Sequence, residues 1–232
     1  MTLVNGIEIA APADVAAVVE SQLLGRGPWD VQSDYSAVDG LKRALQEAGA
    51  LAPAFAAALV ALLRRPEATL VAGAIASLPA ATQVPGDDAV AAIDAHPDRF
   101  RGVAMPAGYP SMGDDLEAAL VMALSQSGAT GGAPLTEFYA RHLQGPSSVW
   151  ALLGLAVAAP DWVVAHAAQA VPRRMIVGVL GKLPDHARRA ALIRALAPWG
   201  TDAATTIASP GWKRLAVPAA EKAELESLLQ SA

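Results

Sequence analysis

The sequence predicts an all-α protein built as an elongated stack of short antiparallel helix pairs. Prolines recur at nearly even intervals in its second half, at positions 146, 160, 172, 184 and 198. Proline ends one helix and is well placed in the first turn of the next, so each interval holds one short helix. The chain is 53% hydrophobic but only 5% aromatic, and its abundant alanine favours helices over strands. Helices of about ten residues are marginally stable alone, so these must stack on one another.

The N-terminal part combines a short hairpin with a group of helices. Asn5-Gly6 lies between alternating apolar residues in LVNGIEI (3–9), which predicts a short N-terminal β-hairpin. The segment 54–63 is apolar on nearly every side, so we expect its helix to be central. The predicted helices of this part cover residues 14–24, 37–48, 53–64 and 66–78.

Paired aspartates open two similar segments, GDDAVAAI (86–93) and GDDLEAAL (113–120). Clustered carboxylates can hold a hard cation, but each pair also precedes an apolar helical run, where an aspartate caps the helix N-terminus. We prefer the capping interpretation. The four histidines lack the spacing of a helical zinc site, and the chain has no cysteine. The sequence therefore predicts no metal and no cofactor.

Two segments with little helical periodicity interrupt the helices, at 96–112 and 128–134. The second is rich in glycine but lacks the Gly-Lys-Ser/Thr of a phosphate-binding loop. We expect one elongated domain over 1–232, with a sub-division into 1–112 and 134–232 around these loops.

The segments between the prolines are amphipathic. Asp161 and Asp185 directly follow prolines, where a carboxylate faces the positive end of the helix dipole. In 161–171, a helical wheel places the valines on one side and Trp162, His166 and Gln169 on the other. The first side is predicted to be core and the second to be available for binding.

Three segments resemble HEAT-like repeats: RRPEATLVAGAIASL (64–78), APDWVVAHAAQAV (159–171) and LPDHARRAALIRALA (183–197). The likeness is to a repeat class and covers about half of the chain. It implies an α-solenoid, in which the helix pairs form a right-handed superhelix with a concave binding face. The helices recur faster here than in a HEAT pair of about 40 residues, so short or irregular repeats are implied.

Charge is unevenly distributed along this acidic chain, whose formal net charge is −5. Residues 1–145 contain eight Lys and Arg against sixteen Asp and Glu, whereas 173–214 contain eight against two. The basic C-terminal array favours an acidic partner, while the acidic remainder argues against general nucleic-acid binding.

These observations predict a non-catalytic module that binds another protein with an acidic surface, as an adaptor or as an immunity-type inhibitor. Tryptophan and arginine are the residues most often found as interface anchors. No catalytic residues are predicted, and the chain lacks the G-x-S-x-G elbow of many hydrolases. The predicted binding residues are Trp162, His166, Gln169, Arg173, Arg174, Lys182, Arg188 and Arg194.

Two other functions stay open. The concave face of the stack is also suited to an enzyme or to a small-ligand or nucleic-acid binder, with Trp162 and His166 in its pocket. The apolar segments over 53–79 also form a candidate membrane-active hairpin, although Pro53 and the Arg64-Arg65 pair make a buried hairpin the preferred interpretation. The start of the chain lacks the features of a secretory signal, which predicts a cytoplasmic protein.

Overall fold

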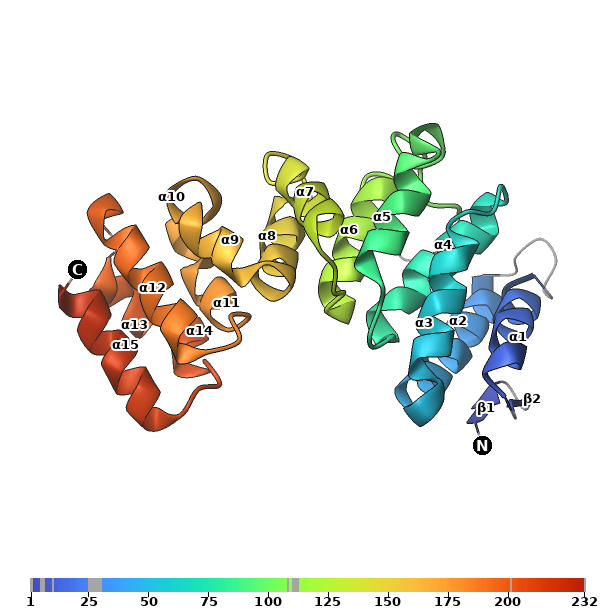
Figure 1. The fold of residues 1–232 in the computed structure, drawn as a ribbon, viewed down its shortest axis with the longest axis horizontal. Helices are drawn as coiled ribbons and strands as arrows, with labels where there is room; N and C mark the ends of the chain where they lie inside the picture. Colours follow the sequence, from blue (N-terminus) through green and yellow to red (C-terminus); the bar gives the residue numbers. More distant parts are fainter. Residues whose placement is uncertain are drawn as a thin grey trace.

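A computed structural model describes residues 2–4, 7–9, 11–24, 31–107, 109, 113–200 and 202–231. Apart from two short strands, the regular secondary structure of the described residues is helical, as the proline spacing and the alanine content predict. Figure 1 shows the helices following one another along the long axis of the molecule, with the N-terminus at one end and the C-terminus at the other.

Two three-residue strands begin the chain. β1 (Thr2–Val4) and β2 (Ile7–Ile9) pair in antiparallel register, with Leu3 opposite Glu8. Asn5 and Gly6, on which the hairpin prediction rests, lie outside the described residues. Two helices follow, α1 (Pro12–Leu24) and α2 (Val31–Gln46).

The apolar segment near residue 55 forms the centre of the N-terminal part. It folds as α3 (Ala52–Leu62), preceded by the 3₁₀ turn η1 (Gly49–Leu51) and followed by α4 (Ala68–Ser77) and η2 (Leu78–Ala80). Because α3 is apolar on most sides, it packs against α1, α4 and α5 at once, and Phe55 and Leu59 are fully buried. The predicted central position of this helix is therefore confirmed.

No single helix among the described residues is long and apolar enough to cross a membrane. The segments Val38–Gln46 and Gly49–Leu62 reach that length and hydropathy only as a pair, and the two are bent by 110° relative to each other.

The paired aspartates act as helix caps, but one of them caps a different helix from the one predicted. Asp115 is the N-cap of α6 (Leu116–Ser127) and accepts a hydrogen bond from the amide of Ala118 at 2.8 Å. Asp87 instead lies within the first turn of α5 (Gly86–Asp94). Its carboxylate accepts from the amides of Gly132 at 2.8 Å and Leu135 at 3.0 Å, at the start of α7 (Ala133–Arg141). The cap therefore joins two helices that are distant in sequence.

The two predicted loops are held by backbone hydrogen bonds. In the first, the 3₁₀ turn η3 (Pro97–Arg99) is followed by a contact of the Leu116 amide with the Val103 carbonyl at 2.9 Å. In the second, Thr130 bonds to Val84 and to Gly86, at 3.1 and 2.8 Å. Residues 108 and 110–112 lie outside the described part. The sub-division of the chain at these loops stays a prediction.

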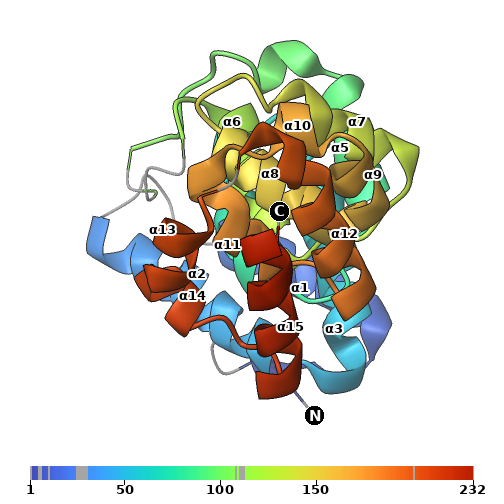
Figure 2. The same ribbon diagram turned by 90° about the vertical axis from the view of Figure 1, so that its left-hand side faces the viewer.

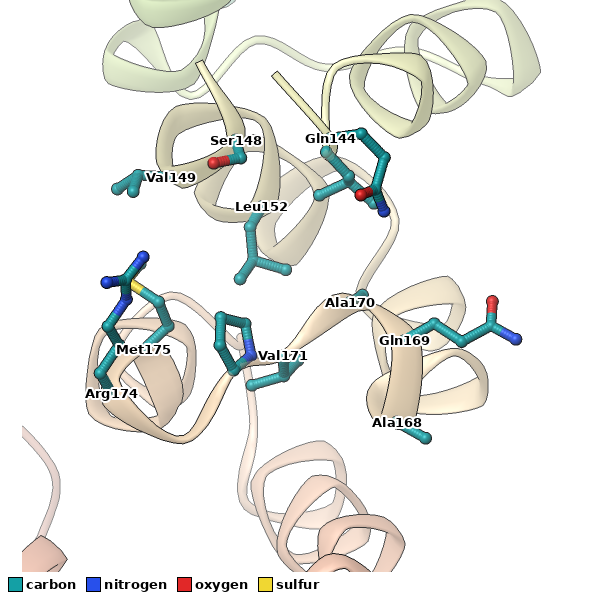
Figure 3. Close-up of a pocket in the computed structure, with 12 residues that line it drawn as sticks. Gln144, Ser148, Val149, Leu152, Ala168, Gln169, Ala170, Val171, Arg174 and Met175 are labelled. Carbon is teal, nitrogen blue, oxygen red and sulfur yellow. The ribbon is translucent and has the colours of Figure 1, made fainter. Parts of the chain in front are cut away.

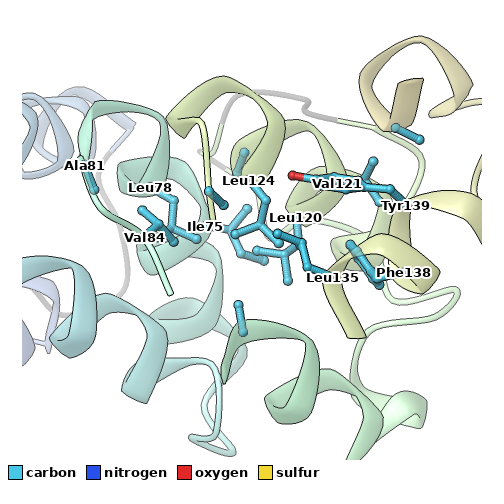
Figure 4. Packing of buried hydrophobic residues seen from close by; sticks show 14 of the residues in the cluster. Ile75, Leu78, Ala81, Val84, Leu120, Val121, Leu124, Leu135, Phe138 and Tyr139 are labelled. Carbon is cyan, nitrogen blue, oxygen red and sulfur yellow. The ribbon is translucent and has the colours of Figure 1, made fainter. Parts of the chain in front are cut away.

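The middle of the molecule is packed closely because one glycine faces a tyrosine. Figure 4 shows Tyr139 and Phe138 of α7 beside Leu120 and Leu124 of α6. A Cβ atom placed on Gly154, in α8 (Ser148–Ala158), would lie 2.4 Å from Cζ of Tyr139. Only glycine allows α8 to approach the ring this closely.

The C-terminal half follows the proline spacing with shorter helices than predicted. The interval 161–171 is split at His166, whose Nδ1 lies 2.8 Å from the carbonyl oxygen of Trp162. The next interval contains a 3₁₀ turn and a helix of five residues. These elements are α9 (Pro160–Ala165), α10 (Ala167–Ala170), η4 (Arg173–Met175), α11 (Ile176–Leu180), α12 (His186–Leu196) and η5 (Ala197–Trp199).

Three further helices end the chain: α13 (Ala203–Ala208), α14 (Pro210–Lys213) and α15 (Ala219–Ser231). Viewed from the C-terminal end, α15 lies in front and α10 and α12 lie behind and above it (Figure 2). Most packing partners are near one another in sequence. The contacts run from α6 to α8, α8 to α9, α9 to α12 and α12 to α15.

Candidate functional site

The Trp162 and His166 side chains form one stacked unit on α9. Their ring centroids are 4.1 Å apart and the ring planes differ by 15°. Both side chains are half-buried, whereas Val163 and Ala167 on the other side are buried. On the predicted core side Val163 and Ala167 are buried and Val164 is half-buried, whereas on the other side Trp162 packs in part against the core. That this second side binds a partner stays a prediction. With Nδ1 against a backbone carbonyl, His166 anchors the end of α9.

A pocket of about 370 Å³ lies between α8 and the segment that runs from α10 to η4, and neither Trp162 nor His166 is among the residues that line it. Leu152 and Val171 form its apolar floor in Figure 3, and Pro172 also lines it. Its rim carries polar side chains, with Arg174 at one end and Gln144 at the other, and Gln169 also lines it. The structure thus brings two of the predicted binding residues, Gln169 and Arg174, to one concave site.

Arg173 connects this pocket to an exposed tryptophan. Its Nη2 donates a hydrogen bond to the carbonyl oxygen of Trp199 at 2.5 Å. The Trp199 residue is 60% exposed, at the end of η5. Tryptophan and arginine are the residues most often found as interface anchors, and here both are exposed within one short stretch of surface. We call Gln169, Arg173, Arg174 and Trp199 the recognition surface.

Arg188 forms ion pairs within the chain. Its Nε lies 2.8 Å from Oδ1 of Asp161 and its Nη2 lies 3.1 Å from Oδ2, while its Nη1 donates to Asp185. The bond from the Arg188 side chain lowers the pKa of the Asp161 carboxyl group, and the Arg188 backbone amide, followed by its side chain, lowers the pKa of the Asp185 carboxyl group. Both carboxylates raise the pKa of Arg188. Arg188 thus joins the starts of α9 and α12, and its charge is already compensated within the chain.

The remaining cations of the basic array are unpaired. Between residues 173 and 214, Arg188 and Arg189 form ion pairs, with Arg189 held 2.6 Å from Glu221. The others are exposed and have no ion-pair partner within the described ranges: Arg173, Arg174, Lys182, Arg194, Lys213 and Arg214. Lys182 and Arg194 line no part of the pocket described above. Of these exposed cations, Arg174 lines the pocket. Thr205 donates the hydrogen bonds that chiefly lower the pKa of the Asp202 carboxyl group, and Arg173 lies near enough to help lower it.

Sequence reasoning missed Trp199, Val149 and Met175. Trp199 follows Pro198 in a short 3₁₀ turn, so no helical face indicated its exposure. Val149 lies near the start of an apolar helix, yet it is 38% exposed. Only the fold places it at the pocket, which Met175 also lines. The one available signal for Trp199 was its type, because tryptophan is frequent at interfaces.

A buried carboxylate elsewhere is fully engaged in structure. Glu117 of α6 is 5% exposed, and its Oε2 lies 2.7 Å from Nε of Arg101. Its Oε1 lies 3.4 Å from both Nη2 of Arg141 and Nε2 of His142. The hydrogen bond that Arg101 donates to Glu117 raises the pKa of Arg101. This cluster joins α6 to α7 and to the loop before α6.

Among the residues that the structure describes, no three His, Asp or Glu side chains are grouped so as to hold a metal ion. Comparison with known proteins found no match to the chain among protein-family models, curated proteins or solved structures.

Proposed function

We propose that the protein is a non-catalytic binding module, an α-solenoid of short HEAT-like repeats that holds an acidic part of another protein. The observation that carries this proposal is the recognition surface itself. Trp199 is 60% exposed, and its backbone carbonyl oxygen accepts a hydrogen bond from Arg173, which has no ion-pair partner among the described residues. Exposing such a ring to water is unfavourable unless a partner covers it.

The surrounding charge supports an acidic partner. Six exposed cations of the 173–214 segment lack ion-pair partners in the described part of the chain, and a negative surface would approach them favourably. The N-terminal half carries an excess of acidic residues, so the attraction is confined to one end of the molecule. An adaptor and an inhibitor of a neighbouring toxin both fit this surface.

Affinity capture from the source lysate, followed by quantitative mass spectrometry, tests this proposal. The baits are the wild type, Arg173→Glu, Trp199→Ala and the charge-matched control Arg43→Glu in α2, at the other end of the molecule (Figure 1). We expect one protein with an acidic surface to be retained by the wild type and by Arg43→Glu and lost from the other two.

Raising the salt concentration from about 0.05 M to 0.5 M should release the same protein, because screening weakens attraction between exposed charges. Equal retention by all four baits, or a retained protein with a basic surface, would contradict the proposal. Circular dichroism of each variant excludes unfolding as the cause of a loss.

A further inference from the structure

The pocket beside α8 has two kinds of recognition chemistry within one concave site. Leu152, Val171 and Pro172 offer an apolar floor, and Met175 adds a side chain that adapts its shape to different ligands. Arg174 borders this floor on one side, as Figure 3 shows, and it is exposed without an ion-pair partner among the described residues. A ligand that fills this site must therefore carry a bulky apolar group close to an anion.

The polar groups on the rim favour a peptide. The planar guanidinium of Arg174 can bind a carboxylate through two parallel hydrogen bonds. Gln144 and Gln169 each offer an amide that both donates and accepts, which matches the N–H and C=O groups of a peptide main chain. Both glutamine side chains are exposed and therefore accessible to a ligand.

The size of the pocket and its surroundings favour an extended ligand. A volume of about 370 Å³ is near the lower end of the range of about 300–1,000 Å³ for ligand sites, enough for one large side chain and its adjoining peptide groups. Val149 continues the apolar surface at the pocket, and Arg173 continues the cationic surface toward Trp199. A linear segment can contact all of these, whereas a compact small molecule cannot.

We infer that this pocket is the docking site for a linear peptide segment in which a bulky apolar residue lies directly beside Asp or Glu. This inference rests on the proposed function and specifies the kind of partner. The apolar side chain occupies the floor formed by Leu152 and Val171, and the neighbouring carboxylate binds Arg174. Acidic residues farther along the segment face Arg173.

A synthetic array of fluorescent octapeptides tests this inference with defined probes. One position varies over Leu, Phe, Trp and Ala, and the two flanking positions vary over Glu, Gln and Lys, in a Gly-Ser background. Binding to the full chain is measured by fluorescence polarisation at low salt. We expect peptides with Phe, Trp or Leu beside Glu to bind best, and replacing Glu with Gln or the apolar residue with Ala to weaken binding about tenfold.

Three variants locate the binding. Arg174→Glu should weaken binding of the acidic peptides by roughly tenfold or more and restore binding of the matching Lys peptides. Val149→Trp should weaken binding by narrowing the mouth of the pocket. Arg194→Glu is the matched control, because Arg194 is equally exposed and unpaired among the described residues but lines no part of this pocket. It should change the affinity by no more than about threefold.

The outcomes separate this inference from the proposed function. If Arg194→Glu and Arg174→Glu weaken acidic peptides equally and Val149→Trp has no effect, the basic surface binds acids without the pocket, and only the inference is wrong. If affinity capture retains a protein partner but no peptide of the array binds, the inference is wrong and the proposed function stands. If neither a peptide nor a protein binds, both are wrong. Binding of a free N-acetyl amino acid as tight as that of the best peptide would show a small-molecule site instead.

Discussion

Arg188 and Asp161 lie 27 residues apart in sequence and connect two helices: Nε of Arg188 lies 2.8 Å from Oδ1 of Asp161. Arg188 also donates its backbone amide to Oδ1 of Asp185 at 2.9 Å. The sequence grouped Arg188 with the cations that bind a partner, whereas the fold uses its charge to hold α9 against α12. Substitutions that test partner binding should therefore avoid it.

Changing Arg188 to Gln should lower stability in a pH-dependent way. At pH 7 we expect the Tm to fall by roughly 1–3 °C, because exposed ion pairs contribute little individually. The pKa values of Asp161 and Asp185 are lowered from about 3.8 in the folded state, so their contribution is present above that value. It is lost as the pH falls through the lowered pKa values, because the unfolded chain then binds more protons.

Thermal unfolding by circular dichroism from pH 7 to pH 2 checks this expectation. The difference in Tm between the wild type and Arg188→Gln should shrink toward zero at the acidic end. Arg194→Gln, at a cation without an ion-pair partner among the described residues, should leave the Tm unchanged at every pH. A difference that stays constant with pH would contradict the role given to the two carboxylates.

Glu117→Gln should destabilise the middle of the molecule. The variant leaves the guanidinium groups of Arg101 and Arg141 without the carboxylate that they share. Because the Arg101 side chain is 54% exposed, water takes over part of its solvation, and we expect a loss of about 1–3 kcal/mol rather than the full cost for a buried pair. Urea unfolding of the wild type and the variant measures this loss in the free energy of unfolding. Glu67→Gln, at an exposed pair, should have almost no effect.

Tyr139→Phe should stabilise the protein. The hydroxyl of Tyr139 is buried without a hydrogen-bond partner among the described residues, and burial raises its pKa. An unsatisfied buried hydroxyl costs about 1–3 kcal/mol, so its removal should raise the free energy of unfolding by about 1 kcal/mol. Tyr109→Phe is the opposite control, because the Tyr109 hydroxyl lies 3.1 Å from the Thr69 carbonyl oxygen. If urea unfolding shows a lower free energy of unfolding for both variants, the Tyr139 hydroxyl is not an unsatisfied buried group.

Gly154→Ala should be strongly destabilising. The added methyl group would lie 2.4 Å from Cζ of Tyr139, so α7 and α8 would have to separate, at a cost of about 1–3 kcal/mol or more. In contrast, Gly178→Ala in α11 meets only Leu153 at 3.7 Å and should stabilise that helix by up to about 1 kcal/mol. In a Tyr139→Ala background, Gly154→Ala should cost much less. Differential scanning calorimetry of these single and double variants checks whether the effect of Gly154→Ala depends on the Tyr139 ring.

The sequence alone determined the helical class of the protein and several of the positions at which its helices begin. Proline spacing and alanine content predict short helices because both act on the backbone of their own segment. For the same reason Asp115 and Asp185 are found where capping was predicted, at the starts of α6 and α12. The burial of α3 follows from its composition, because a helix that is apolar on nearly all sides must be surrounded.

Only the tertiary structure decided which charged side chains are available to a binding partner. Arg174 and Arg188 lie in similar basic segments, yet one lines a pocket and the other is neutralised by Asp161 from another helix. The pocket itself combines α8 with the segment after α10, and Trp199 reaches the recognition surface through Arg173. These relationships depend on contacts between distant segments, and a pattern within one segment carries no information about what a neighbouring helix presents to it.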